Sequence, residues 1–374
     1  MSRIPLLDLT RQTKALESQL QKGLLRVLSK GHFILGPEVS RFERKFARFC
    51  GRRFGIGVGS GTDALELALR AFGIGRDHLV ATVSFTFIAT VDAIRHVGAE
   101  PLFVDIDPVT YTMSPLSLQE RINRLSSSDR RRLKAVIPVH LFGHPCDMDA
   151  ILRIAKRHRL RVIEDAAQAA GARWRGKPAG SFGDAGCFSF FPSKNLGAFG
   201  DGGMVVTDSA PAAARLRALR VHGRRGNGDQ FELGRNSRLD ELQAAVLNVK
   251  IRRLGRWLSS RRRIARFYNQ QLARVPHLTC PVEAPEASHA YCLYVIRSPQ
   301  RDAVQRRLMR AGIAAQVYYA TPVHRQPIYG GRYRSLHLPE TEKACREALA
   351  LPIFPELTRR EHLRICRALQ STHP

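Results

Sequence analysis

Lys194 has the setting in this sequence that points most strongly to chemistry. It lies between two apolar runs, 187–191 and 204–207, and a glycine-rich stretch follows it. An isolated ammonium group is costly to remove from water, so a lysine beside a buried strand is uncommon. A desolvated lysine has a lowered pKa and can form a Schiff base with a carbonyl compound. The alternative is an ordinary lysine in a surface loop, and the other motifs must decide between a reactive lysine and a surface lysine.

A glycine-rich turn that leads into a helix is a second candidate site. FGIGVGSG (54–61) reads as the end of a short strand, and the strong helical pattern TDALELALRAFG (62–73) follows it. Ser60 and Asp63 have the spacing of a capping box. Such a helix N-terminus attracts anions through its free N–H groups and its dipole. The turn lacks the GK[ST] of a P-loop and the GxGxxG of a dinucleotide site, so those two phosphate motifs are excluded.

Further candidate side chains follow predicted strands. Phe87 lies in SFTFIAT (84–90), and Asp165 and Gln168 lie in VIEDAAQAAG (162–171). In parallel α/β sheets, ligands bind at the carboxyl ends of the strands. From local sequence alone, Asp165 could equally be the N-cap of a helix.

The elements that must position these residues alternate between strands and helices. Strands are predicted at 79–82, 101–105, 135–141 and 160–164, and helices at 86–97 and 147–159. Apolar strands without alternation indicate a mostly parallel sheet covered on both faces. We therefore expect an α/β large domain over residues 1–249.

The pattern changes after this region. A long helical pattern runs from Asp240 to about Arg274, with an interruption near Gly255. A strand at 291–296, a helix at 302–311, a strand at 314–318 and a last helix after a Thr358–Glu361 capping box are then predicted. We expect a smaller α+β domain over residues 250–374.

Composition describes an ordinary globular protein with an unusual charge. The 374 residues are 44% hydrophobic, yet the formal net charge is +28. Such a charge attracts polyanions such as nucleic acid, but a compositional drift toward arginine is the preferred explanation. An enzyme with an anionic substrate would also gain from a positive field, so the charge does not decide the class, and no helix-turn-helix or RNA motif accompanies it. The seven cysteines form no CxxC pair, which favours free thiols and no metal site. Without an apolar run long enough for a signal peptide or a membrane span, we expect a cytoplasmic protein and no membrane partner.

Together these residues supply the needs of pyridoxal 5'-phosphate. That cofactor requires a lysine for its aldehyde, an anion site for its phosphate, a carboxylate for its ring nitrogen and a flat group against its ring. Lys194, the turn at 61–63, Asp165 and Phe87 meet these four needs.

At this point the motifs are recognisable. They are SGTDAL (60–65), SFTFIAT (84–90), EDAAQAAGA (164–172), FSFFPSKNLGAFGDGG (188–203), GRNSRLDELQAA (234–245), PVHRQPIY (322–329) and LPIFPEL (351–357). In this order the chain resembles the DegT/DnrJ/EryC1/StrS family of sugar aminotransferases, which have the type I fold of pyridoxal-phosphate-dependent transferases. The resemblance covers nearly the whole chain.

The resemblance implies roles for the central residues. Lys194 would bind the cofactor covalently and then move the proton between the substrate and the cofactor. Asp165 would keep the ring nitrogen protonated, Gln168 would hydrogen-bond the phenolic oxygen, and Phe87 would stack on the ring.

The remaining implied contacts concern the phosphate and the substrate. Gly61, Thr62 and the Ser189 hydroxyl would hold the phosphate. Asn236 would reach the same phosphate from the partner subunit of a homodimer. His324 would lie at the substrate mouth, although it could equally be a packing residue.

The implied reaction is transamination of a keto-sugar linked to dTDP or UDP, at C3 or C4 and with a slight preference for C3. L-glutamate would be the donor and 2-oxoglutarate the product, in a ping-pong cycle. Arg224, Arg225 or Arg238 would face the pyrophosphate. Two alternatives stay open: a sugar dehydratase of the same fold, in which histidine is typical at position 194, and a basic regulatory protein that binds nucleic acid.

Overall fold

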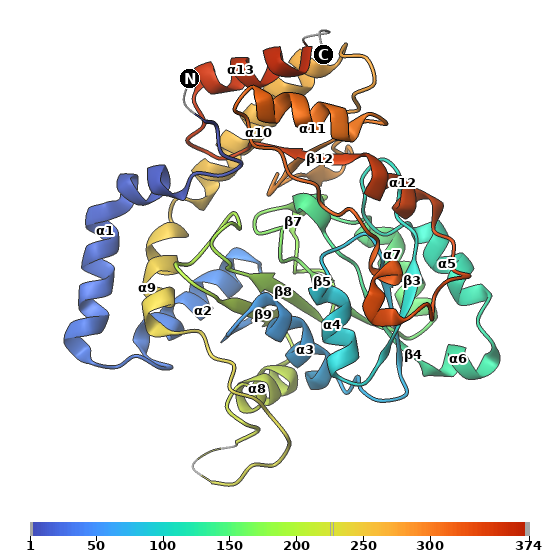
Figure 1. The fold of residues 1–374 in the computed structure, drawn as a ribbon. Coiled ribbons are helices and arrows are strands. Elements are labelled where there is room, and N and C mark those ends of the chain that lie inside the picture. Colours follow the sequence, from blue (N-terminus) through green and yellow to red (C-terminus); the bar gives the residue numbers. More distant parts are fainter. Residues whose placement is uncertain (1–2, 225, 227, 371–374) are drawn as a thin grey trace.

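A seven-stranded sheet forms the centre of the larger part of the molecule (Figure 1). The computed structural model describes residues 3–224, 226 and 228–370. The strand order is β1-β9-β8-β5-β4-β2-β3, with β1 (Phe54–Val58), β2 (Leu79–Val83), β3 (Glu100–Val104), β4 (Leu133–Ile137), β5 (Arg161–Asp165), β8 (Ala185–Ser189) and β9 (Gly203–Thr207). Strand β9 runs opposite in direction to the other six strands, so its pairings with β1 and β8 are antiparallel and the remaining pairings are parallel. The predicted α/β class with a mostly parallel sheet is confirmed.

Helices cover both faces of this sheet. They are α2 (Pro37–Phe49), α3 (Gly61–Ala71), α4 (Ala89–His96), α5 (Pro115–Asn123), α6 (Ser127–Arg132), α7 (Met148–Arg157), α8 (Ala210–Leu219) and α9 (Glu241–Lys250). Helix α1 (Leu9–Lys30) packs on α9 instead, through Leu16 and Leu20. One apolar cluster joins α3, α4 and α8 to the sheet, and a second joins α2 and α9 to it. Every residue of β2 and β9 is buried, because helices lie against both faces.

A smaller unit lies above the large sheet in Figure 1. Its strands β11 (Tyr294–Arg297) and β12 (Ala348–Leu351) pair antiparallel, and α10 (Leu254–Leu272), α11 (Arg301–Arg310) and α13 (Arg359–Gln370) pack around them. Ile4 joins this core, so the two ends of the chain lie near each other. The rest of the chain contributes α12 (Pro339–Glu347), a small sheet of β6 (Arg173–Trp174), β7 (Lys177–Pro178) and β10 (Ala287–Ser288), and the 3-10 turns η1 (Leu141–Gly143), η2 (Val323–Arg325) and η3 (Pro327–Tyr329).

Several details beyond residue 240 differ from the sequence-based expectation. The long helix is divided into α9 and α10 by residues 251–253, a little before Gly255. The predicted strand at 314–318 is reduced to one bridge between Gln316 and Ala350, because the following residues turn into the wall of a cavity. The capping box before α13 is confirmed, since Glu361 accepts the Thr358 N–H at 2.8 Å.

The two units are not separated cleanly along the chain. Val323 and Leu338 pack against Val91 and Phe103 beside the large sheet, although they follow α11 in sequence. A domain boundary after residue 249 stays a prediction. None of the described helices is long and apolar enough to cross a membrane.

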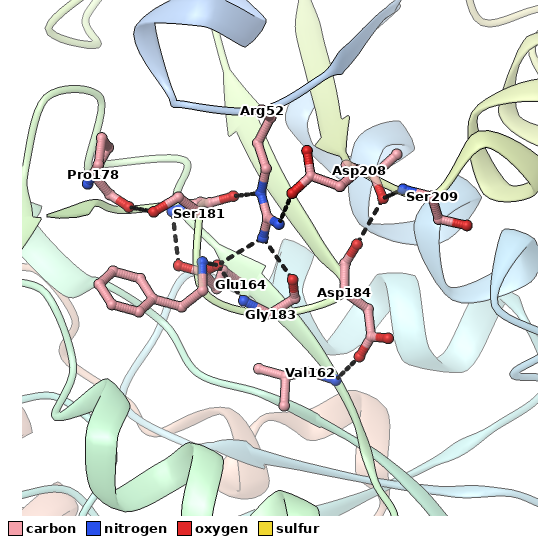
Figure 2. A network of polar contacts seen from close by, with 12 residues as sticks. Arg52, Val162, Glu164, Pro178, Ser181, Gly183, Asp184, Asp208 and Ser209 are labelled. Atoms are coloured by element: carbon pink, nitrogen blue, oxygen red, sulfur yellow. Dashed lines mark hydrogen bonds and ion pairs between the residues drawn. The ribbon is translucent and has the colours of Figure 1, made fainter.

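Glu164, near the carboxyl end of β5, lies in a network of polar contacts (Figure 2). Its fully buried carboxylate accepts the N–H groups of Gly180 and Phe182, both at 2.7 Å, and of Gly183 at 2.8 Å. Arg52 closes the same loop by donating to the carbonyl oxygens of Gly180 and Gly183 at 3.0 and 2.5 Å. The contacts hold the residue immediately before Asp165 in one position.

His140 completes this network as a hydrogen-bond donor. Its Nδ1 accepts the Cys146 N–H at 3.0 Å, so its proton must lie on Nε2, which is 3.0 Å from the Glu164 carboxylate. Burial by itself would raise the pKa of Glu164, but the hydrogen bonds from His140, Gly183 and Gly180 hold that pKa below its ordinary value.

We expect Glu164→Gln to destabilise the protein by ~3–5 kcal/mol, because an amide group would face buried N–H donors in place of a charge. A depressed carboxyl pKa stabilises the fold above the ordinary pKa and loses this contribution as pH falls through the folded-state pKa. Urea denaturation at pH 7 and below pH 4 measures both effects. The control is Asp208→Asn, whose side chain is 47% exposed at the rim of the network and which should cost less than ~1 kcal/mol. Equal losses in the two variants would contradict the assignment.

Candidate active site

A cavity of about 680 Å³ lies where the parallel strands end. The chain that follows β1, β2, β4, β5 and β8 supplies one wall, and residues of the C-terminal unit supply the other. Parallel strands bring their carboxyl ends to one edge of the sheet, so residues far apart in sequence meet there. The predicted residues lining the cavity are Gly61, Thr62, Phe87, Asp165, Gln168, Ser189 and Lys194.

Lys194 enters the cavity from a tight loop after β8. Its own N–H donates to the Phe191 carbonyl oxygen at 2.9 Å. Gly197 is required in this loop, because a Cβ there would lie 2.2 Å from the carbonyl oxygen of Pro192. Buried Lys250 donates to the Gly197 carbonyl oxygen at 2.8 Å and fastens the loop to α9. Lys194 Nζ itself has no hydrogen bond or ion pair with any residue that the structure describes.

Asp165 lies in the same cavity and is held rigidly. One carboxylate oxygen accepts the Thr90 hydroxyl at 2.7 Å, and the other accepts the Ala167 N–H at 3.1 Å. Burial raises the pKa of Asp165, while the hydrogen bond from Thr90 and the charge of Lys194 act in the opposite direction. A buried carboxylate of this kind is suited to a cationic N–H partner. Thr90 was not singled out from the sequence, although it lies in the SFTFIAT motif.

The glycine-rich turn has the form of an anion site. Ser60 is the N-cap of α3 and its hydroxyl accepts the Asp63 N–H at 3.1 Å. The N–H groups of Gly61 and Thr62 have no acceptor among the described residues. Gly61 also lies against Ser189, since a Cβ at position 61 would be 2.7 Å from the Ser189 Cβ. Two free N–H groups and a serine hydroxyl therefore converge at a helix N-terminus.

We expect Gly61→Ala to raise the dissociation constant of the cofactor at least ~10-fold, the equivalent of ~1.4 kcal/mol. The added methyl group would push the turn away from Ser189 and separate the phosphate donors. Titration of the cofactor-free protein measures the change. Gly75→Ala is the matched control, because its Cβ would meet nothing closer than the Val97 carbonyl oxygen at 3.5 Å. Cofactor binding as tight as in that control would contradict the placement of the phosphate.

Gln168 and Phe87 both line the cavity and both contact Tyr319. The Gln168 side chain accepts the Phe142 N–H at 2.6 Å and donates to the Tyr319 hydroxyl at 3.2 Å. Phe87 is 56% exposed, and its ring centre lies 6.2 Å from that of Tyr319. An exposed ring in a cavity wall offers a face to a flat ligand. Tyr319 was missed in the sequence, because no local pattern connects it with residues more than a hundred positions earlier.

Three predicted residues do not line this cavity. His324 is buried beside β2, where its Nδ1 is 2.7 Å from the Ser84 hydroxyl and its ring is 6.0 Å from that of Phe103. Asn236 and Arg238 lie in the segment between α8 and α9.

The segment that carries Asn236 is nevertheless attached beside the anion site. Ser237 accepts the Gly59 N–H at 3.0 Å and donates to Asp63 at 2.9 Å, while the side chain of Asn236 is exposed. Of the other predicted basic residues, Arg224 lies in the same segment and Arg225 is outside the described residues.

The residues present fit pyridoxal phosphate in size, charge and donor set. A free lysine, a buried carboxylate, an open N-terminal turn and an exposed aromatic ring share one cavity. Among the described residues, no group of three His, Cys, Asp or Glu side chains could hold a metal ion. Fold and site together define an enzyme of the type I aminotransferase class, whose cofactor is pyridoxal phosphate.

Comparisons with known proteins identify the family. A model of the DegT/DnrJ/EryC1/StrS aminotransferase family matches residues 14–370, and the chain belongs to this family. The crystal structure of S. venezuelae DesV in complex with a ketimine intermediate has a TM-score of 0.95 and 41% identity, covering 99% of this chain and 98% of that one.

Three curated relatives are similar over almost their whole length. The chain is 45% identical to the "pleiotropic regulatory protein" of Geobacillus stearothermophilus, covering 95% of this chain and 94% of the relative. It is 41% identical to the dTDP-3-amino-3,4,6-trideoxy-alpha-D-glucose transaminase of Streptomyces venezuelae, covering 98% and 96%. It is 43% identical to the UDP-N-acetyl-3-dehydro-alpha-D-glucosamine 3-aminotransferase of Acidithiobacillus ferrooxidans, covering 99% and 98%. The chain is an aminotransferase of the nucleotide-sugar type.

Proposed function

We propose that this protein transfers the amino group of L-glutamate to C3 of a keto-sugar linked to dTDP or UDP, for amino-sugar biosynthesis in the cytoplasm. The observation that carries the proposal is the full-length similarity to relatives named as transaminases of such sugars at C3. The shared cavity of Lys194 and Asp165 supports the same reaction.

The cavity residues divide the work of transamination. When bound, the cofactor supplies a carbonyl group for the amine and a ring that accepts electrons. Lys194 Nζ holds the cofactor and then moves the proton between the substrate carbon and the cofactor. The Asp165 carboxylate keeps the proton on the ring nitrogen. Gln168 orients the ring through its remaining N–H, and Phe87 covers one face.

The phosphate and the substrate are bound around this centre. Gly61, Thr62 and Ser189 bind the phosphate through two N–H groups and a hydroxyl. Arg238 lies outside the cavity of its own chain, like Asn236, so it would attract the pyrophosphate of the nucleotide sugar from the partner subunit, and the net charge of +28 assists this attraction. His324 is buried, so it would shape the substrate mouth through Ser84 rather than touch the sugar.

The exposed Asn236 is the basis for a shared active site. In a homodimer, Asn236 of the partner subunit would reach the cofactor phosphate, since this residue lies outside the cavity of its own chain. We expect Lys194→Ala and Asn236→Ala homodimers each to be impaired, whereas mixed dimers regain activity at one of their two sites. Refolding the two variants together and measuring turnover tests this. No recovery in a mixture shown to contain heterodimers would contradict a shared site.

A panel of dTDP- and UDP-linked keto-sugars with glutamate tests the reaction itself. The proposal expects an amino sugar and 2-oxoglutarate in equal amounts. A product that has lost a hydroxyl group instead would favour a dehydratase, although Lys194 stands where that group of enzymes typically has histidine.

A regulatory role is the alternative from another class. The name of the Geobacillus stearothermophilus relative and the basic charge favour it. Duplex DNA binding with site preference at moderate salt would support this role. If the protein bound DNA through its net charge alone, the binding would be weak and would be abolished by salt.

A further inference from the structure

Arg261 is a buried cation in the cavity wall without an acidic partner. It lies on α10, is 3% exposed, and lines the same cavity as Lys194. Among the described residues it forms no ion pair, and only the more distant charges of Cys292 and Glu356 oppose the effect of burial on it. The burial lowers the pKa of the Arg261 guanidinium. A buried charge without a partner is costly, so its presence in a ligand cavity indicates that an anionic ligand completes it.

Backbone carbonyl groups bind the Arg261 guanidinium through Nη1 only. Nη1 donates to the carbonyl oxygens of Tyr291 at 3.0 Å, Ile353 at 2.9 Å and Cys292 at 3.4 Å. Nε has no hydrogen-bond partner, and Nη2 has none among the described residues. Nε and Nη2 form one edge of the planar group, and such an edge matches the two oxygens of a carboxylate.

The cavity around Arg261 is apolar. Leu6, Leu7, Val317, Leu351 and Ile353 line it together with the guanidinium. A ligand that extends from Lys194 toward Arg261 would therefore pass short aliphatic groups along apolar side chains and end on a cation. A dicarboxylic amino acid has this form: an amine and one carboxylate on the carbon at one end, methylene groups in the middle and a second carboxylate at the other end.

We propose that Arg261 binds the side-chain carboxylate of the amino donor and so determines that glutamate is used rather than glutamine. This inference rests on the proposed function, because it takes glutamate to be the donor. Arg261 is a specificity residue and takes no part in proton transfer.

The test is the donor half of the reaction, followed in single turnovers of the holoenzyme. Loss of the visible absorption of the bound cofactor is measured with glutamate and with glutamine, which differ only in the side-chain charge. Wild type should react with glutamate at least ~10-fold more efficiently than with glutamine, as expected for a charge-assisted pair. In Arg261→Gln and Arg261→Lys this ratio should fall to ~3 or less, mainly through weaker binding of glutamate.

Arg262→Gln is the matched control. Arg262 is the next residue of α10 and also donates to backbone carbonyl oxygens, His289 at 2.9 Å and Gly171 at 3.2 Å, but does not line the cavity. It should share any loss of stability and keep the wild-type ratio. The inference is overturned if wild type uses both donors equally, a comparison that needs no variant to fold, or if the Arg261 variants keep the wild-type ratio.

The acceptor half separates this inference from the proposed function. Wild-type enzyme loaded with the amine form of the cofactor is mixed with the keto-sugar panel. Failure to form an amino sugar would contradict the proposed function. The glutamate-to-glutamine ratio is measured in the donor half, so it would still test the role of Arg261.

Discussion

The Lys194→Ala variant is expected to fold normally and to lose at least ~10³-fold in turnover, in the range for removal of a group that transfers a proton. The side chain has no hydrogen bond or ion pair within the described structure, so its removal should cost little stability. The visible absorption of the bound cofactor should also change, because its attachment to Nζ is lost. Turnover of glutamate with a keto-sugar and the absorption spectrum measure the two effects.

Lys194→Arg separates charge from covalent chemistry. Arginine keeps the positive charge near Asp165 but, being protonated at all accessible pH values, cannot react with the cofactor aldehyde. We expect it to be as inactive as the alanine variant. A spectrum unchanged in Lys194→Ala would show that another group holds the cofactor.

Asp165→Asn is expected to lower turnover by ~10²–10⁴-fold, because a neutral amide cannot keep the ring nitrogen protonated. Although the substitution lowers turnover, it should not lower the stability of the cofactor-free protein at pH 7. Burial raises the pKa of Asp165 above its ordinary value, and a raised carboxyl pKa stabilises the fold only at low pH, with the contribution lost as pH rises through the folded-state pKa. At pH 7 the cofactor-free asparagine variant should therefore be at least as stable as wild type.

Thermal denaturation of the cofactor-free proteins between pH 4 and pH 8 measures the difference in stability between Asp165→Asn and wild type. The Thr90→Val variant is the companion measurement, because it removes the 2.7 Å hydrogen bond that opposes the rise of the Asp165 pKa. It should lose activity less severely than Asp165→Asn. An asparagine variant with wild-type turnover would disconnect Asp165 from the reaction.

Much of the candidate site could be predicted because its residues follow strands of a parallel sheet. Lys194, Asp165 and Phe87 each lie a few residues beyond an apolar strand, and such a sheet brings strand ends together whatever its loops do. Ser60 and the capping box of α13 were also predictable, since a cap depends on residues only three positions apart.

The exact partners in the site depended on packing between distant segments. Tyr319 and Arg261 reach the cavity from the C-terminal unit, and no local periodicity reports which face of that unit lies over the sheet. The same packing buries His324 against Ser84, outside the cavity, although its motif suggested the substrate mouth.

The sequence by itself determined the α/β sheet and singled out the candidate lysine and the candidate anion turn, because each follows from patterns within a few residues. Only the tertiary structure decided which side chains face the cavity from the other side. It also showed that Glu164, next to Asp165 in β5, is held by hydrogen bonds from the N–H groups of Gly180 and Phe182. The reason is physical: the desolvation of a side chain and its choice of partner are set by contacts between segments that lie from about twenty to more than two hundred residues apart in sequence.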